Sequence, residues 1–461
     1  MAVQEQSRSG DNAYVGDYRR NVPGEDAELT HVGPNTPCGE FMRRYWHPVA
    51  LSSDVSDLPL AVRILGEDLV VFRDKANRVG VLHRHCSHRG TSLEYGIPSD
   101  QGIRCCYHGW LFDVDGRILE TPGEPPDSRL KDSFVHGAYP AEERHGLIFA
   151  YMGPPDEIPE FPVFDTYLTP ANNRLIPYSL WQPCNWLQIR ENGMDPIHAV
   201  FLHSRLTEVH FTEPWASMPV YEFFETGDGM HYLTTRRVGE FLWIRSAQFT
   251  LPNIGQTGGL WEEATESKYF GRVSLTRWVV PVDDTNSWIF GLRHFNDVVD
   301  PEHQGREEEC GHDSVDFVGQ DGNRPYAERQ RNPGDWDAQV SQRPIAVHDL
   351  EHRGSTDVGV AMLRRIVRET IRGEKTPVIP TGMAAGNEVM YTYSYDTVLR
   401  VPARDDLDDE EVQREVGRRV MEAIKSGDAV SDAEAREAQI VECLKEIEAG
   451  ASRRSEIKSE A

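Results

Sequence analysis

The chain has 461 residues, 39% of them hydrophobic, with a mean hydropathy of -0.54. Its 75 acidic and 48 basic residues give a formal net charge of -27, which argues against nucleic acid or an anionic membrane as a partner. No run approaches the roughly 18 to 20 apolar residues of a membrane span, and the first residues lack the apolar stretch of a signal peptide. Seven cysteines, an odd number, favour reduced thiols, so we expect a cytoplasmic protein.

Turn signals and composition predict an α+β protein. Short β-branched runs separated by turns such as Asp115-Gly116 predict a small antiparallel β domain in the first third of the chain. Longer strand-like runs follow, with helical stretches predicted at 181–203 and 336–371, which together indicate an antiparallel sheet flanked by helices. The predicted parts are a mobile arm at 1–28, a β domain with its lead-in segment at 29–160, a larger domain at 161–403 and an acidic helical tail at 404–461.

The tail contains two apolar stripes at helical spacing. Gly427 lies between them and predicts the end of the first helix. A charged helical hairpin is one interpretation, and packing of the hairpin onto a neighbouring subunit is the other. The stripes are Val412, Val416, Val420 and Ile424, then Ile440, Leu444 and Ile447.

A metal-ligand motif lies in the small β domain. Cys86 and His88 are followed by Cys105 and His108, which gives the pattern C-x-H-x16-C-x2-H. Zinc sites also use two cysteines and two histidines, but they usually keep the cysteines together and the histidines together. Here each loop supplies one of each, and this mixture suits a [2Fe-2S] cluster in which the cysteines bind one iron and the histidines the other.

The sequence around these residues resembles the Rieske signature. Arg89-Gly90 follows the first Cys/His pair, and Gly109-Trp110 follows the second. The resemblance implies a Rieske [2Fe-2S] cluster held at two loop tips of a β scaffold. Two other protein classes remain open at this point, an electron-transfer protein with this cluster alone and a zinc-binding structural protein.

A second constellation lies at the start of the larger domain, where Asn192, Asp195, His198 and His203 fall within twelve residues. Two histidines with a carboxylate are the ligand set of non-haem Fe(II) sites that bind O2. Residues three apart on a helix differ by about 60° and residues five apart by about 140°. His198 and His203 therefore splay on a regular helix, and we predict a π-type bulge or a helix break between them.

The two motifs together resemble the catalytic α subunits of the Rieske non-haem iron oxygenases, in their phthalate dioxygenase-like branch, over roughly residues 28 to 375. The resemblance implies that His198 and His203 bind a mononuclear Fe(II) and that Asn192 lies near it. It also implies that Asp195 bridges His198 to the cluster ligand His108 of an adjacent subunit. Such a carboxylate would also fix the histidine tautomers.

The resemblance places the third iron ligand late in the chain, in NPGDWDAQVSQRPIAV. Counting back from Pro344 gives Asp335, with Gln339 and Gln342 on the same helical face. Asp337 is the competing candidate. A carboxylate that only stabilises a helix N-terminus is the alternative for either residue.

The implied enzyme is a Rieske-type oxygenase of EC class 1.14. It takes electrons from a separate reductase or ferredoxin, because the chain has no G-x-G-x-x-G dinucleotide motif, and it hydroxylates an aromatic substrate with or without a carboxylate. The alternative is a monooxygenase or demethylase acting on an ether, an N-methyl group or a non-aromatic compound. The family also implies a homotrimer or trimer-based oligomer. Seven arginines are candidates for holding a carboxylate: Arg190, Arg205, Arg236, Arg237, Arg245, Arg272 and Arg277.

Overall fold

The computed structural model describes residues 22–168, 173–296, 299–300, 302–375, 389–430 and 432–456, the last five by their backbone alone. Most of the predicted N-terminal arm, residues 1–21, lies outside this range. The predicted arm extends to residue 28, yet helix α1 begins at Ala27. The reason is electrostatic, because Glu28 accepts hydrogen bonds from Arg372 at 2.7 Å and from Arg368.

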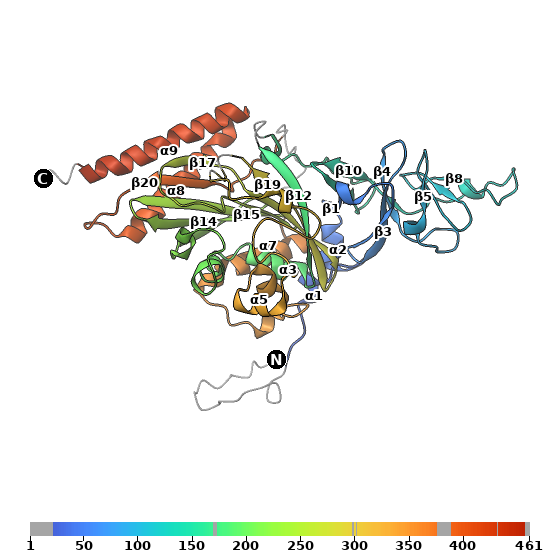
Figure 1. Ribbon diagram of the computed structural model, residues 1–461, viewed down its shortest axis with the longest axis horizontal. Helices are drawn as coiled ribbons and strands as arrows, with labels where there is room; N and C mark the ends of the chain where they lie inside the picture. Colours follow the sequence, from blue (N-terminus) through green and yellow to red (C-terminus); the bar gives the residue numbers. More distant parts are fainter. Residues whose placement is uncertain are drawn as a thin grey trace.

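The small β domain contains three antiparallel sheets (Figure 1). The cluster motif lies in the loops that follow β4 and β6, and the sheet of short strands that contains β5 and β8 is at the extremity of the molecule. The sheets are β1-β11-β10 (Trp46–Leu51, Leu147–Tyr151, Ala141–Arg144), β2-β3-β4-β9 (Leu60–Ile64, Glu67–Arg73, Val79–His83, Ala138–Tyr139) and β5-β6-β7-β8 (Ile97–Pro98, Ile103–Arg104, Leu111–Phe112, Ile118–Glu120).

The larger domain is built on one antiparallel sheet of nine strands, which agrees with the predicted α+β class. The main path is β12-β19-β18-β16-β15-β14-β13, and β20 pairs with both β15 and β17. The strands are β12 (Arg174–Gln182), β13 (Val220–Glu225), β14 (Gly229–Val238), β15 (Phe241–Thr250), β16 (Ile254–Thr257), β17 (Lys268–Gly271), β18 (Leu275–Asp283), β19 (Asn286–Phe295) and β20 (Asp396–Arg400).

Helices lie on both faces of this sheet (Figure 1). Those near the metal-ligand residues are α3 (Trp186–Asn192), α4 (His198–Val200), α5 (Tyr326–Arg331), α6 (Asp335–Val340) and α7 (Val358–Ile371). Helix α2 spans Pro37–Met42 and α1 ends at Thr30. None of the described helices is both long and apolar enough for a bilayer span.

Two helical predictions were wrong in part. Trp181 belongs to strand β12, so helix begins only at Trp186, where the Asn185 side chain accepts a hydrogen bond from the Leu187 amide. The region 336–371 is interrupted between α6 and α7. Arg343 has a φ of +88° and precedes a proline, and the residue before proline is sterically driven out of the helical region.

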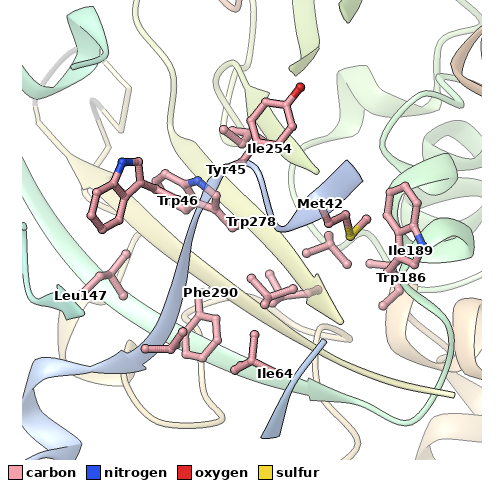
Figure 2. Close-up of a cluster of buried hydrophobic side chains, with 14 of the residues drawn as sticks. Met42, Tyr45, Trp46, Ile64, Leu147, Trp186, Ile189, Ile254, Trp278 and Phe290 are labelled. Carbon is pink, nitrogen blue, oxygen red and sulfur yellow. The ribbon is translucent and has the colours of Figure 1, made fainter. Parts of the chain in front are cut away.

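One buried apolar cluster joins the small domain to the large one (Figure 2). Trp46 and Leu147 come from the small domain, and Trp278 and Phe290 come from the large sheet. Phe149 and Trp278 meet edge to face, with ring centroids 5.5 Å apart. Because this core crosses the predicted boundary at residue 160, it fixes the orientation of the small β domain against the sheet.

The tail forms two helices, α8 (Asp409–Ser426) and α9 (Ala433–Glu456), and Gly427 caps the first as predicted. Both helices lie over the end of the sheet that carries β20 and β17 (Figure 1). The two apolar stripes pack against Leu233, Leu242 and Leu399 of the same chain. The chain's own sheet therefore covers these stripes, and packing of the hairpin onto a neighbouring subunit stays a prediction.

Candidate metal centres

The loops after β4 and β6 bring the four cluster residues together. The thiols of Cys86 and Cys105 point inward, and each residue is 3% exposed. Each loop closes through a glycine with positive φ, because the Gly90 amide donates to the Cys86 carbonyl and the Gly109 amide donates to the Cys105 carbonyl. Glycine adopts this left-handed conformation without the steric cost that other residues incur.

The two histidines lie on the outer side of the pair of loops. His88 is half-buried and His108 is exposed, and their ring centroids are 4.5 Å apart. His88 stacks on Trp110 at 4.6 Å. The sulfur ligands are thus inside and the imidazoles outside, which suits a cluster whose histidine-bound iron faces a partner.

The chemistry of these side chains fits a metal cluster. Burial and the neighbouring Cys105 thiol raise the pKa of Cys86 to about 11. The Cys86 thiol therefore stays protonated unless a cation binds it. Cys106, the neighbouring cysteine, is exposed and points away from this pair.

His198 and His203 come from two turns of unlike geometry. The α-helical turn at His198 passes into a π-helical turn, η6 (Phe201–Arg205), which confirms the predicted π-type bulge. The wider turn brings the two ring centroids to 5.5 Å. Asp335, the first residue of α6, places Oδ1 at 3.5 Å from His198 Nε2 and at 3.3 Å from His203 Nε2.

The protonation of this triad fits a bound cation. His198 Nδ1 contacts the backbone carbonyl of Asp195, and a carbonyl only accepts, so the proton is on Nδ1 and Nε2 keeps its lone pair. Burial alone would raise the pKa of Asp335, but the positive charge of His203 and His198 in their protonated form and the amide of Gln320 hold this pKa well below its usual range. When both imidazoles are neutral, a bound cation would supply the same positive charge to the carboxylate. Imidazole nitrogens with free lone pairs and an ionised carboxylate converge on one point, which is the donor set of a divalent metal.

Asp335 and Asp337 have different surroundings. Asp335 accepts hydrogen bonds from Asn192 Nδ2 at 3.2 Å and from Gln320 Nε2 at 2.6 Å. Asp337 instead pairs with Arg329 at 3.0 Å and accepts from the Gly334 amide at the helix start. Asp337 thus has the contacts of a helix-capping carboxylate, whereas Asp335 faces the histidines.

Asp195 lies beside His198 at the rim of this site. Its Oδ1 accepts from the Ile197 amide at 2.8 Å, and its Oδ2 is 3.8 Å from His198 Nδ1. The backbone carbonyl of Asp195, rather than its carboxylate, therefore accepts the His198 proton. The side chain is 29% exposed and borders an open cleft with His198 and Leu202.

The triad opens into a cavity in front of the large sheet. Apolar side chains, among them Phe211, Leu260 and Phe317, make up much of its wall. The space available to the centres of water-sized molecules is about 80 Å³, which at about 10 to 15 Å³ per water accommodates only a compact ligand.

The seven candidate arginines have different environments. Arg190, Arg245 and Arg277 line the cavity. Arg237 pairs with Asp409, Arg272 pairs with Glu437, and Arg205 and Arg236 donate to the backbone carbonyls of Ala216 and Ser217. The four arginines outside the cavity thus have roles in holding the fold.

Sequence reasoning missed three residues in and behind the triad. His210 contacts His203, Gln320 contacts Asp335, and Asn332 contacts His210. His210 and Gln320 lie outside the stretches that the sequence singled out, and Asn332 begins the stretch that contains Asp335. Gln320 is brought in by a close backbone contact, because a Cβ on Gly319 would lie 2.6 Å from the Gly334 Cα. A pair of glycines in two distant loops is the only sequence signal for that approach.

The two candidate centres are far apart in one chain. Strands β5 and β8, which flank the cluster loops, are at one extremity of the molecule, whereas α3 is near its middle (Figure 1). The cluster loops and the triad thus belong to separate regions of the protein.

Residues 45–139 match the family described as Rieske [2Fe-2S] domain. The chain is 48% identical over 459 residues to the tert-butanol monooxygenase/tert-amyl alcohol desaturase oxygenase subunit of Aquincola tertiaricarbonis, covering 95% of this chain and 97% of the relative. It is 38% identical to the phenoxybenzoate dioxygenase subunit alpha of Ectopseudomonas oleovorans, covering 78% and 88%. A crystal structure of dicamba monooxygenase has the same fold, with a TM-score of 0.54 at 19% identity over 73% of this chain and 99% of that one. The chain therefore belongs to the Rieske non-haem iron oxygenases as a catalytic α subunit, whose cofactors are a [2Fe-2S] cluster and a mononuclear iron.

Proposed function

We propose that this α subunit oxidises a compact substrate at an Fe(II) held by His198, His203 and Asp335. The observation that carries the proposal is the convergence of two imidazole Nε2 atoms and one carboxylate at the wall of a cavity lined by both apolar and charged side chains. Three ligands leave coordination positions open, as O2 chemistry at such sites requires. Asn192 takes part by donating to Asp335, which orients that carboxylate.

The cluster ligands in this proposal are Cys86, His88, Cys105 and His108. When bound, the two metal groups supply electron transfer and O2 activation. The chain's own residues supply the rest. The buried cysteines hold the inner side of the cluster, and the histidines expose its outer side to another protein. A solved structure of carbazole 1,9a-dioxygenase holds the oxygenase in complex with a ferredoxin, and we infer a reductase or a ferredoxin as the electron donor here.

Electron transfer to the triad requires a second subunit in this proposal. The cluster loops and the triad are separated in one chain (Figure 1). Asp195 is partly exposed beside His198, at an open cleft. We infer a homotrimer in which His108 of one subunit reaches Asp195 of the next, so that the carboxylate bridges the two centres.

For the substrate we propose an aromatic carboxylate of about one ring. The apolar wall supports a hydrophobic body, and the limited space argues for a compact one. The phenoxybenzoate dioxygenase relative is named for an aromatic acid. One observation favours a second candidate, hydroxylation of a tertiary alcohol, because the relative that matches nearly the whole chain is named for tert-butanol.

The first experiment measures iron and acid-labile sulfide on anaerobically purified protein, with EPR after reduction by dithionite. About three irons and two sulfides per chain are expected for one [2Fe-2S] cluster and one mononuclear iron. Zinc in place of iron, or two irons even after incubation with Fe(II), would contradict the proposal.

The second experiment addresses the substrate. The reduced, iron-loaded enzyme is incubated with ¹⁸O2 and with benzoate or tert-butanol in parallel. Labelled product from benzoate supports the aromatic acid, and labelled product from tert-butanol alone supports the second candidate.

We also infer a cytoplasmic location. All seven cysteines are free of disulfides, which is the state that reducing compartments maintain.

A further inference from the structure

A buried guanidinium lies at the cavity wall beside the triad. Arg190, on the last turn of α3, is 6% exposed. Two glycines leave room for its terminal nitrogens. A Cβ on Gly255 would lie 2.3 Å from Nη1, and a Cβ on Gly193 would lie 2.4 Å from Nη2. The guanidinium therefore occupies a place that side chains at these two positions would fill.

Arg190 has few partners within the described residues. Its Nε makes no hydrogen bond, and Nη1 reaches the Asn253 carbonyl only at 3.5 Å. Burial and the nearby charge of Arg277 lower the pKa of Arg190 to about 9. Tyr178 is the one group that acts in the opposite direction, and no carboxylate does.

Several other buried arginines have carboxylate partners. Arg293 pairs with Asp316 at 3.0 Å, with both side chains fully buried. Arg364 pairs with Glu191 and with Glu351. Arg236 and Arg245 are buried without an ion pair among the described residues, but both lie over the Trp215 ring and donate to backbone carbonyls. A buried charge without a counter-charge is strongly destabilising, and within the described residues Arg190 has neither a carboxylate nor an aromatic ring against it.

A second guanidinium faces the same cavity. Arg277 donates to Gln320 Oε1 at 3.3 Å, and its Nε is buried without a partner. Gln320 in turn donates to Asp335. Among the residues that line the cavity, Asp335 is the only acidic one, and it faces the histidines. Arg190 and Arg277 thus line the cavity, as Arg245 does, and neither of the two has a carboxylate partner among the described residues.

We propose that Arg190 and Arg277 form a subsite that binds the carboxylate of the substrate in the cavity of His198, His203 and Asp335. This inference rests on the proposed function, whose substrate class it narrows to an anion. The two guanidinium groups line the cavity and would supply charge-assisted hydrogen bonds to the carboxylate. Binding of the carboxylate would also place the apolar body of the ligand between this subsite and the triad.

The test compares two ligands of nearly equal shape, benzoate and neutral benzamide, by calorimetric titration of the iron-loaded enzyme. Acetate, phthalate and tert-butanol complete the panel. The expected result is that the enzyme binds benzoate more tightly than benzamide. Loss of one charged hydrogen-bonding partner should weaken benzoate binding by about 10- to 100-fold, so R190M and R277M should each reduce this preference. R190K, which keeps the charge but loses the planar fork, should fall in between.

The matched control is R272M, because Arg272 pairs with Glu437 on the tail and lies outside the cavity. It should bind benzoate as the unmodified enzyme does. A further readout is the melting temperature without ligand. R190M should melt at the same temperature or higher, since it removes an unpaired buried charge.

Three results would overturn the subsite: binding of no carboxylate in the panel, an undiminished benzoate preference in R190M, or a clear drop in the melting temperature of R190M. If the enzyme contains its mononuclear iron and oxidises only neutral ligands, the subsite fails while the proposed oxygenase function stands. If the mononuclear iron is absent, the proposed function fails whatever the ligands do.

Discussion

His203 Nδ1 and His210 Nδ1 lie 2.9 Å apart, and their hydrogen-bond partners determine which of the two carries the proton. Asn332 Oδ1 accepts from the Glu208 amide, so it also accepts from His210 Nε2, at 3.1 Å. Burial lowers the pKa of His210, which keeps the ring neutral, and its Nδ1 is then an acceptor. His203 therefore donates from Nδ1 and directs the lone pair of Nε2 toward Asp335.

Replacing His210 should weaken the iron site without removing any of its proposed ligands. Loss of a partner behind a ligating histidine typically reduces metal affinity by about 10- to 100-fold. We expect this loss in H210A, measured as faster release of Fe(II) to a chelator. H210Q should recover part of it, because its amide oxygen can accept from His203.

The control for that variant is H312A, since His312 pairs with Asp54 away from the cavity. Cluster content should be the same in all three variants. Equal rates of Fe(II) release from H210A and the unmodified enzyme would contradict the prediction.

D335A should lose most of its mononuclear iron and retain the two cluster irons, because the only acidic side chain lining the cavity is removed. D337A is the matched variant. It should retain iron and lose about 1 kcal/mol of stability, the typical value of a helix cap. Iron analysis and urea unfolding separate the two, and an unchanged iron content in D335A would shift the ligand assignment to Asp337.

D195N should retain both metal centres and lose most of the product formed per electron supplied. The amide keeps an oxygen for the Ile197 amide but removes the charge that would bridge two imidazoles. The measurement is product formation together with the iron content of the same sample. A variant that lacks mononuclear iron would show that Asp195 is a ligand or a folding element instead.

L444A should destabilise the tail within a single chain. Leu444 is fully buried against the sheet, and removal of such a side chain costs about 2–5 kcal/mol. L407A is the control, because Leu407 is 44% exposed and surface changes are usually within about 0.5 kcal/mol. Urea unfolding at two protein concentrations is the measurement. A loss that appears only at high concentration would indicate packing between subunits.

Sequence reasoning reached furthest where the chemistry is local. Cys86 and His88 belong to one loop, and His198 and His203 to adjacent turns, so spacing alone predicted both groups and the π-helical turn between the histidines. The sequence predicted that the third ligand is an aspartate but did not decide between Asp335 and Asp337. The two residues differ in their contacts with Gln320, Asn192 and Arg329, among others, and these partners are distant in sequence.

The other questions that the sequence left open also depend on contacts between distant parts of the chain. No pattern within 404–461 states which surface its apolar stripes cover, because that depends on the exposed faces of β14, β15 and β20. Likewise, the sequence offered seven arginines as equal candidates for binding a carboxylate. Their roles differ because Arg272 pairs with Glu437 and Arg237 pairs with Asp409, whereas others line the cavity.

The two metal regions are separated within one chain (Figure 1), so a subunit that lacks one metal centre can still contribute the other. A chain without its triad still presents an intact cluster, and a chain without its cluster still presents an intact triad. In the proposed homotrimer, mixed assemblies of D335A and C86S chains would contain junctions where one subunit supplies the metal centre that its neighbour lacks. Two preparations that are inactive alone would then regain activity on mixing, by complementation between subunits.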